Sequence, residues 1–576
     1  MQEKNIETKK CRNCSADFNI TDKDIAFYDK TSPMFLIETG LKKFLIPSPN
    51  LCSDCRQQRR LSFRNERNLY RRKCDFSGKD MISIYSPDKR YKVYSQEEWW
   101  SDRWNPLDFG KDFSFSENFF DQFVELANNV PRIALIQKNS QNSQYTNDIE
   151  GSKNCYLCFT SWENEDCMYV SNIFWSKSCI DGFWLSECEN CYEGINLSKC
   201  YNVNHSFACF DCTDSNYIFD CKGSRNCMFS IGLINQEYFF LNERTDKETF
   251  ARYEKEIRTN KIFLADCLKK FNDMIFKTPR CFSNQVRCEN STGDFLSDSS
   301  DNQEAYDSHY IKDCKYIYQG GNLFDVMDCS ITGANEKCSL SYEGLSAAGS
   351  NGCLFTVTVW NCNNVLYSDN CHNSSNLFGC IGLRNSQYCI LNKQYTREEY
   401  ETLVPKIIEH MKTTGEWGEF FPSSISPFGY NETVAMEYYP ISSSDAINRI
   451  ATDGKPIFKW STYENPKPDV TKIIPASKLP ENIKDIPDDI TNWAIECEVT
   501  QKPFRIIKQE LEFYRKHDLP IPRRHPDQRH LDRMKLRNPR KLYDRNCDRC
   551  NKEIKTTFSP ERPEIVYCED CYIEKN

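Results

Sequence analysis

The chain has 576 residues, 32 cysteines and a formal net charge of −9. A chain of this length can form several domains around a substantial core. Its first ten residues are polar and no apolar run approaches the length of a membrane span, which argues against a secretory signal and a transmembrane protein. We therefore expect a reducing, cytoplasmic location, where cysteines act as metal ligands or core residues and not as disulfides.

Residues 1–99 are predicted to form an N-terminal zinc module. Its two Cys-x-x-Cys pairs are Cys11 with Cys14 and Cys52 with Cys55. Two such pairs place four thiolates around one Zn²⁺ ion and leave no coordination position for a substrate, so the site is predicted to be structural. The run from Arg56 to Leu69 is predicted to be a helix, as in a treble clef.

An aromatic linker at 100–150, with an apolar helical pattern from Phe119 to Leu126, leads into a repeated region. In residues 151–262 cysteines recur every 21 residues, at Cys158, Cys179, Cys200 and Cys221. Short β-prone runs alternate there with polar corners. This period predicts a β-solenoid with about 21 residues in each coil, in which cysteine serves as a small apolar residue.

Residues 263–412 are predicted to be a second copy of this solenoid. When the two copies are aligned at an offset of 150 residues, Cys212 pairs with Cys362 and the neighbouring segments also match. Cysteines nine residues apart suggest coils of about 18 residues in this copy. Each copy is predicted to end in a helix, capped by Asp246 or by Thr396, with Glu399 completing a capping box in the second.

Residues 413–489 are rich in proline and aromatic side chains, which predicts an extended segment wrapped over the solenoid. Residues 490–576 are predicted to be a C-terminal zinc module. Its ligands are Cys547, Cys550, Cys568 and Cys571. The spacing again suits a closed, structural Zn²⁺ site.

The two end modules read as copies of one ancestral module, each of which has lost a different metal site. Offsets of 486 and 473 residues align them. The lost ligand positions are Cys497, Thr500, His525 and Gln528 at the back, and Cys74, Ser77, Ser95 and Glu98 at the front. The predicted fold is therefore mainly β: a cysteine-laddered β-solenoid in two duplicated halves, flanked by two duplicated α+β zinc-ribbon or treble-clef-like modules, in the order A, B, B′, A′.

A third metal site is possible within the solenoid. Its four candidates are Cys188, Cys191, Cys209 and Cys212, which repeat the spacing of the C-terminal site. The alternative, which we favour, is that these cysteines are packed core residues, because the cysteine columns continue on either side without matching pairs.

Two basic segments, of local charge +6 at 52–73 and +7 at 515–545, are candidates for binding RNA or DNA. The arginines concerned are Arg56, Arg59, Arg60, Arg64, Arg67, Arg71, Arg523, Arg524, Arg529, Arg533, Arg537 and Arg540. The leading prediction is a non-enzymatic scaffold that binds nucleic acid or a ribonucleoprotein through these segments. The alternative is that they pair with the acidic middle of the same chain, in a protein with a structural or protein-binding role.

Two enzymatic alternatives are weaker. A nuclease would use His525 and His530 as base and ligand. A carbohydrate hydrolase or lyase would use an acidic cluster at the start of the second solenoid, formed by Asp298, Asp301, Glu304, Asp307 and His309. Fold analogy is the main warrant for the second, so no catalytic residue is predicted.

Three strings carry a resemblance that spans nearly the full length. They begin at Leu51 (LCSDCRQQRR), at Trp417 (WGEFFP, with PFGYNET from Pro427) and at Leu519 (LPIPRRHPDQRH). In these strings the chain resembles an uncharacterised bacterial family of cysteine-rich zinc-ribbon proteins. Gln501 stands where glycine is usual in that family. The resemblance implies the architecture described above and no particular activity, substrate or partner.

Overall fold

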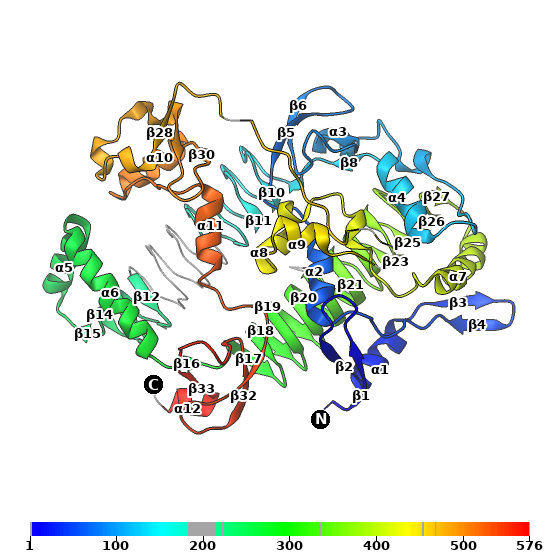
Figure 1. The fold of residues 1–576 in the computed structure, drawn as a ribbon, viewed down its shortest axis with the longest axis horizontal. Helices are drawn as coiled ribbons and strands as arrows, with labels where there is room; N and C mark the ends of the chain where they lie inside the picture. The colour runs from blue at the N-terminus through cyan, green and yellow to red at the C-terminus, as the bar shows by residue number, and fades with distance from the viewer. Residues whose placement is uncertain are drawn as a thin grey trace.

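The computed structural model describes residues 3–182, 215–221, 223–332, 336–451, 454, 456–466 and 468–574. The chain is mainly sheet. Parallel strands stack into two ladders, and the two end modules and several helices pack around them (Figure 1). We call residues 137–182 and 215–244 the first ladder, because they share one buried core cluster, and residues 285–394 the second ladder.

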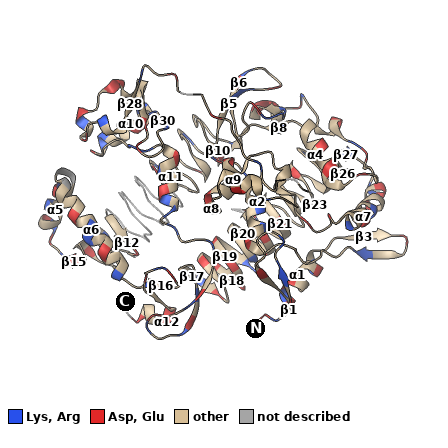
Figure 2. Cartoon of the chain, in the orientation of Figure 1, with Lys and Arg blue, Asp and Glu red and all other residues tan. Residues whose placement is uncertain are grey.

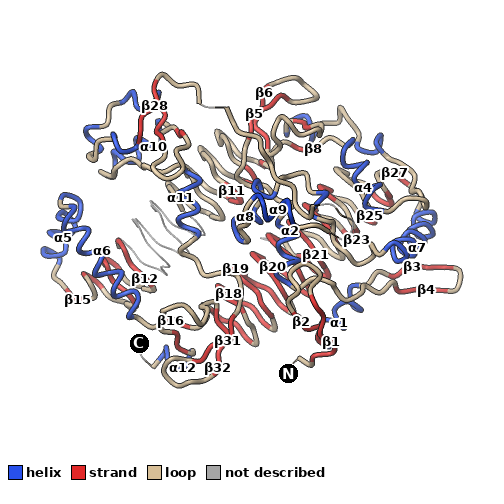
Figure 3. The backbone as a smooth tube through the Cα atoms, viewed as in Figure 1, coloured by secondary structure: helices blue, strands red, loops and turns tan. Residues whose placement is uncertain are grey.

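The second ladder contains the largest sheet of the described chain. Its strands are β17 (Gln285–Glu289), β18 (Gly293–Ser300), β19 (Gln303–Lys312), β20 (Lys315–Thr332), β21 (Cys338–Ala348), β22 (Leu354–Trp360), β23 (Asn363–Leu366), β24 (Asp369–His372), β25 (Ser375–Phe378), β26 (Gln387–Ile390) and β27 (Lys393–Gln394). Most parallel pairs are offset by 12 residues, as in Ala305 with Ile317, and we call each such step along the chain one rung of the ladder. Hydrogen bonds that link a side chain to the neighbouring rung span the same interval. Between β20 and β21 the offset is 15, as in Leu323 with Cys338. Figure 3 shows β18 to β21 side by side.

The first ladder follows the same rule. Its strands are β9 (Gln137–Lys138), β10 (Asn147–Glu150), β11 (Phe159–Trp162), β12 (Asn216–Phe219), β13 (Arg225–Ile231), β14 (Glu237–Phe240) and β15 (Glu243–Arg244). Parallel partners such as Ile149 and Ser161 are one rung of 12 residues apart, as are the side chains that bond between rungs. Single bridges continue the pattern to Ile180.

A three-residue period explains this 12-residue rung. Asn154, Leu157 and Thr160 all have positive φ, near 50°, and a residue with positive φ recurs at every third position to Asp181. We call these positions the corners of the coil. The residues that follow each corner, such as Cys155 and Cys158, point inward and are fully buried. Four sides of three residues therefore complete one turn, and the residue above Cys158 is Val170, not Cys179.

The coil lengths expected from the cysteine spacing are therefore wrong, because both exceed one rung. Cys158 and Cys179 do share the inner face, since their separation is a multiple of three, but one and three-quarter turns lie between them. The column that does stack is Cys155, Cys167 and Cys179, each one rung beyond the last. In this column a thiol donates to a backbone carbonyl nine residues further on, as Cys155 does to Asn164 at 3.6 Å.

Each ladder ends in a short antiparallel strand followed by helix. β14 pairs with β15 and β26 pairs with β27, both antiparallel. The helices are α5 (Lys247–Thr259), α6 (Lys261–Lys277) and α7 (Arg397–Thr414). The predicted caps are confirmed: Asp246 accepts from the amide of Thr249, and Thr396 with Glu399 forms a capping box.

The end modules are built from small sheets and short helices. At the front lie β1 (Asn5–Lys10), β2 (Asp17–Thr21), α1 (Asp22–Thr31), β3 (Met34–Ile37), β4 (Gly40–Lys43), α2 (Ser53–Leu61), β5 (Tyr70–Lys73), β6 (Asp80–Ser83), β7 (Val93–Tyr94) and α3 (Gln96–Trp100). At the back lie β29 (Trp493–Glu496), β30 (Pro503–Phe504), α10 (Lys508–Lys516), α11 (Pro526–Met534), β31 (Tyr543–Asn546), β32 (Glu553–Thr556), β33 (Val566–Tyr567) and α12 (Glu569–Ile573). Because α2 ends at Leu61, the helix predicted to reach Leu69 is too long.

The remaining segments tie the modules to the ladders. They contain η1 (Pro106–Phe109), α4 (Phe119–Asn129), β8 (Arg132–Ile133), β16 (Arg280–Cys281), η2 (Ser423–Ile425), η3 (Tyr430–Glu432), α8 (Val434–Tyr438), α9 (Ser443–Asn448), β28 (Lys472–Pro475), η4 (Ala476–Lys478), η5 (Ile483–Asp485) and η6 (Asp488–Asn492). Trp417 and Phe421 are buried in one cluster with Phe355 and Tyr367 of the second ladder. The proline-rich segment thus packs on that ladder through its aromatic side chains.

Candidate metal centres and arginine clusters

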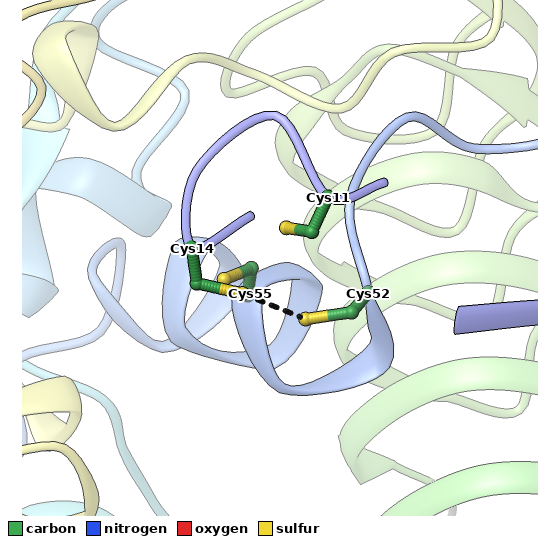
Figure 4. Close-up of side chains that lie close together, drawn as sticks. All are labelled: Cys11, Cys14, Cys52 and Cys55. Atoms are coloured by element: carbon green, nitrogen blue, oxygen red, sulfur yellow. Dashed lines mark hydrogen bonds between the residues drawn. The ribbon is translucent and has the colours of Figure 1, made fainter. Parts of the chain in front are cut away.

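The front module brings Cys11, Cys14, Cys52 and Cys55 together. Their four Sγ atoms all lie within 4.8 Å of one another, and Cys14 Sγ is 3.7 Å from Cys52 Sγ. Figure 4 shows the four side chains around a common centre. The first pair lies on a tight turn, in which Ser15 has a φ of 62° and Cys11 N–H donates to Ala16 O. The second pair lies at the N-cap and first turn of α2. The group can hold one metal ion.

The back module repeats this arrangement with Cys547, Cys550, Cys568 and Cys571. Their Sγ atoms also lie within 4.8 Å of one another, and Cys550 Sγ is 3.6 Å from Cys568 Sγ. Cys568 is the N-cap of α12, and its amide donates to Cys547 Sγ at 3.2 Å. Two Cys₄ groups able to bind metal are therefore present, as the sequence predicts.

In each group the pKa of one cysteine is lowered, whereas burial and neighbouring thiols raise the pKa of others, namely Cys14 and Cys55 in the front group and Cys568 and Cys571 in the back group. The thiol of Cys55, followed by its amide, lowers the pKa of Cys52 to about 5 although burial opposes this. Burial also opposes ionisation of Cys547, yet the backbone amides of Cys550 and Cys568 lower its pKa to about 6. Neighbouring thiolates repel, so a full set of four ionised sulfurs requires a cation between them. Four cysteines with closed geometry suit a soft or borderline metal without an open position.

At each of the two positions that the sequence alignment predicts as a lost metal site, one cysteine is held by backbone amides. Cys74 is buried and accepts from the amides of Ser77 and Ser95, at 3.5 and 3.3 Å. Cys497 is buried and accepts from the amide of Thr500 at 3.5 Å. The sulfur of each of these cysteines thus accepts from backbone amides, as the sulfur of Cys547 does in the complete back group. The four cysteines proposed as a third site, Cys188, Cys191, Cys209 and Cys212, lie outside the described residues.

The three arginines of α2, Arg56, Arg59 and Arg60, lie inside the protein. Arg56 Nε is 2.8 Å from Asp328 Oδ2, and Arg60 Nη1 is 2.7 Å from Glu343 Oε2. Arg59 bridges Glu343 and Glu419, at 2.7 and 2.9 Å. Three guanidinium groups and three carboxylates thus form one buried, charge-balanced cluster, which we call the front arginine cluster. It joins α2 to β20 and β21.

The arginines of the back module form a second set of contacts, the back arginine cluster. Arg529 and Arg533 both bind Asp181 of the first ladder. Arg537 and Arg540 both bind Asp307 of the second ladder, at 2.7 Å. The front module has a comparable contact to the other ladder, because Arg64 binds Asp148. Figure 2 shows the basic residues of α2 and α11 on helices that lie close to the ladders.

The prediction that these twelve arginines face a nucleic acid is therefore not supported. Arg56, Arg59, Arg60, Arg64, Arg529, Arg533 and Arg540 are buried. The others also have partners within the chain: Arg67 donates to Ser171, Arg71 to Tyr145, Arg523 to Leu479 O, Arg524 to Glu498 and Asp532, and Arg537 to Asp307. Internal pairing, the alternative considered from the sequence, is what the structure contains.

Sequence reasoning placed Asp307 in a possible catalytic cluster and did not single out Asp181 or Asp328 as partners of the arginines. Asp181, Asp307 and Asp328 all lie at corners of positive φ, yet they are buried. The signal of Asp328 in the sequence is a single acid among apolar residues, Val326-Met327-Asp328-Cys329. A buried charge requires a partner, so such positions predict an arginine from another element.

The side chains proposed for the two enzymatic alternatives do not come together as a catalytic site. Within the cluster of acids proposed for carbohydrate chemistry, Asp298 pairs with Arg287 at 2.5 Å and Asp307 belongs to the back arginine cluster. Asp301 accepts from Asn290. Of the histidines proposed for a nuclease, His525 caps the start of α11 and His530 Nε2 lies 3.1 Å from Glu437 Oε2. These side chains serve separate local contacts.

Glu437 and His530 form a titratable pair. Burial raises the pKa of Glu437 to about 7, and burial lowers the pKa of His530 well below its usual range. The pair lines a cavity of about 10 Å³, about the size of one water molecule, between the two ladders. Both groups are therefore most stable in their neutral forms.

Glu437→Gln is expected to protect the protein against alkaline pH. A raised carboxyl pKa gives stability that is complete below the ordinary value of 4.5 and is lost as pH rises through about 7. Glutamine removes this loss, so relative to the parent the variant should gain about 2.5 kcal/mol between pH 5 and pH 8. Thermal unfolding at both values measures it. Glu97→Gln, on the exposed side of α3, is the control, and an equal gain in that variant would refute the assignment.

Comparison with known proteins yields no match: no family model, no curated protein and no solved structure is similar to the chain. Within the described ranges, no helix combines the length and the apolar character needed to cross a bilayer. The Cys₄ groups and the arginine clusters therefore carry the functional argument by themselves.

Proposed function

We propose that this protein is a zinc-stabilised, non-catalytic scaffold in which two zinc modules fasten a duplicated β-solenoid. The observation that carries the proposal is the pair of Cys₄ groups, each with its sulfurs within 4.8 Å of one another. Four thiolate ligands at this spacing suit Zn²⁺ and occupy every tetrahedral position, so the ion would stabilise the fold and would not activate water or substrate.

The three-residue sides and the 12-residue register support a four-sided solenoid. The duplication is supported by the residues that bind one another. Asp181 and Asp328, the main acceptors of the two arginine clusters, are 147 residues apart. Further along, the offset between similar segments is 150. The rung between β20 and β21 has 15 residues, three more than the usual 12, and these three residues would raise the offset from 147 to 150.

The duplication of the end modules is supported in the same way. The paired arginines, 473 residues apart, are Arg56 with Arg529, Arg60 with Arg533 and Arg64 with Arg537. In each module the first two of these arginines bind an aspartate of one ladder, and the third arginine binds an aspartate of the other ladder. Each zinc module would therefore clamp both halves of the solenoid. Membership in the cysteine-rich zinc-ribbon family and a reducing, cytoplasmic location remain parts of this proposal.

Metal content tests the proposal directly. Elemental analysis of the purified protein should give two zinc ions per chain. A third ion would assign Cys188, Cys191, Cys209 and Cys212 as ligands as well. Removal of zinc by a chelator should make residues 1–99 and 490–574 sensitive to protease before the ladders are cleaved, because a structural zinc site folds with its metal. Protein without zinc, or modules that resist protease equally after chelation, would overturn the proposal.

A further inference from the structure

We infer that a groove beside helix α10 is a binding site for a neutral saccharide. The groove has a volume of about 510 Å³ and is open to solvent. It is lined by Asn142, Asn154, Asp166, Met168 and Ser178 of the first ladder and by Gln509, Glu512, Phe513, Lys516 and His517 of the back module. Neither the metal ligands nor the arginine clusters contribute to it, so this inference does not depend on the proposed function.

One wall of the groove is a column of small polar side chains. Asn142, Asn154, Asp166 and Ser178 follow one another at intervals of 12 residues, and each has a φ near 50°. They therefore occupy the same corner of four successive rungs, spaced about 4.8 Å apart. Asn142 Nδ2 lies 3.3 Å from Asn154 Oδ1, and Asn154 Nδ2 lies 3.0 Å from Asp166 Oδ1. The column offers a repeated set of donors and acceptors along the ladder axis.

The opposite wall is held in place by the packing of α10. Gln509 Nε2 donates to Asn154 O at 3.3 Å, and Phe513 is buried in the cluster that includes Met168. Glu512 and Lys516 are exposed on the same helix. The two walls therefore come from segments more than 300 residues apart in sequence, on a rigid ladder and a docked helix.

The lining selects the chemistry of the ligand. Pockets of about 300–1,000 Å³ that bind drug-like ligands are mostly apolar, whereas eight of the ten residues that line this groove carry an amide, hydroxyl, charged or imidazole group. Amides both donate and accept, as hydroxyl-rich ligands require. Two carboxylates, Asp166 and Glu512, against the single ammonium of Lys516 disfavour a polyanion such as RNA. Part of the exposed lining is apolar, which suits the face of a sugar ring.

Calorimetric titration of the full chain with maltohexaose, cellohexaose, xylohexaose and N-acetylated chitohexaose tests the site. We expect saturable binding of at least one of these neutral oligosaccharides. Lys516→Trp, which fills the groove, should weaken that binding by about tenfold or more, equivalent to about 1.4 kcal/mol. Lys478→Trp, at an exposed lysine outside the lining, is the matched control and should bind as the parent does.

The unfolding temperature of each variant shows whether the fold is retained. If Lys516→Trp does not fold, Glu512→Ala, which shortens an exposed lining side chain, replaces it and should weaken binding without lowering the unfolding temperature. No heat from any of the four oligosaccharides at millimolar concentration would overturn the inference. Binding that is unchanged in the folded groove variant would overturn it equally.

Discussion

Replacement of Glu343 by glutamine is expected to lower the free energy of unfolding by about 3–5 kcal/mol, because it leaves three buried guanidinium groups with two carboxylates, Asp328 and Glu419, so that one buried charge is uncompensated. Glu343 is 1% exposed and receives Arg59 Nη2 and Arg60 Nη1, both at 2.7 Å. An amide can accept one of these bonds but supplies no negative charge. Urea unfolding measures the effect as a lower midpoint, and protease cleavage within residues 1–99 should become faster.

The control for this prediction is an exposed ion pair of the same module. Lys30 Nζ lies 2.6 Å from Asp325 Oδ1, with side chains 53% and 31% exposed. Lys30→Ala should cost less than about 1 kcal/mol, since water screens exposed pairs. The double variant Glu343→Leu with Arg60→Met should recover part of the lost stability, because apolar side chains can replace a buried pair. Equal midpoints for Glu343→Gln and Lys30→Ala would show that the front arginine cluster is not a stabilising clamp.

Cys547→Ser is expected to remove one of the two zinc ions and to unfold the C-terminal module. Free energies of Zn²⁺ binding in small zinc modules are on the order of 10–16 kcal/mol near neutral pH, which exceeds the stability of such a module without metal. Zinc content by elemental analysis should fall from two ions to one per chain. Protease should then cut between residues 540 and 574 while residues 1–99 stay protected.

Cys74→Ser supplies a matched control for the metal prediction. Cys74 occupies the position of Cys547 in the other module and has the same kind of backbone donors, but the remaining ligand positions hold Ser77, Ser95 and Glu98. We expect two zinc ions to remain in this variant, with a loss of stability typical of a buried substitution, about 1 kcal/mol. Loss of zinc from Cys74→Ser, or retention of both ions by Cys547→Ser, would contradict the ligand assignment.

The metal centres could be predicted from the sequence because their information is local. A Cys-x-x-Cys pair creates its own turn, and the four thiols need only be brought together by a small module. The helix caps at Asp246 and Thr396 are local for the same reason. The length of helix α2 was not predicted, because the arginine-rich run after Leu61 is polar and continues in irregular backbone that docks on the ladders.

The rung length could not be read from cysteine spacing. Every third residue of the ladders points inward, so any spacing that is a multiple of three satisfies the same burial pattern. Only the hydrogen-bond register distinguishes these spacings, and Asn147 pairs with Phe159. The binding partners of the arginines could not be predicted from the sequence either. Arg56 and Asp328 are 272 residues apart, and a basic helix looks the same whether its partner is a phosphate or a distant carboxylate.

The antiparallel strands β15 and β27 have a consequence for assembly. The last parallel strand of a ladder would otherwise present a row of unpaired amides and carbonyls, which is a template for another strand. In β26, Cys389 and Ile390 instead pair with Gln394 and Lys393 after the chain has reversed. A rung from another molecule therefore meets a strand of the wrong direction and a helix beyond it. Each ladder is therefore capped at this end, and substitutions that free β26 from β27 are expected to expose an edge on which a strand from another molecule can pair.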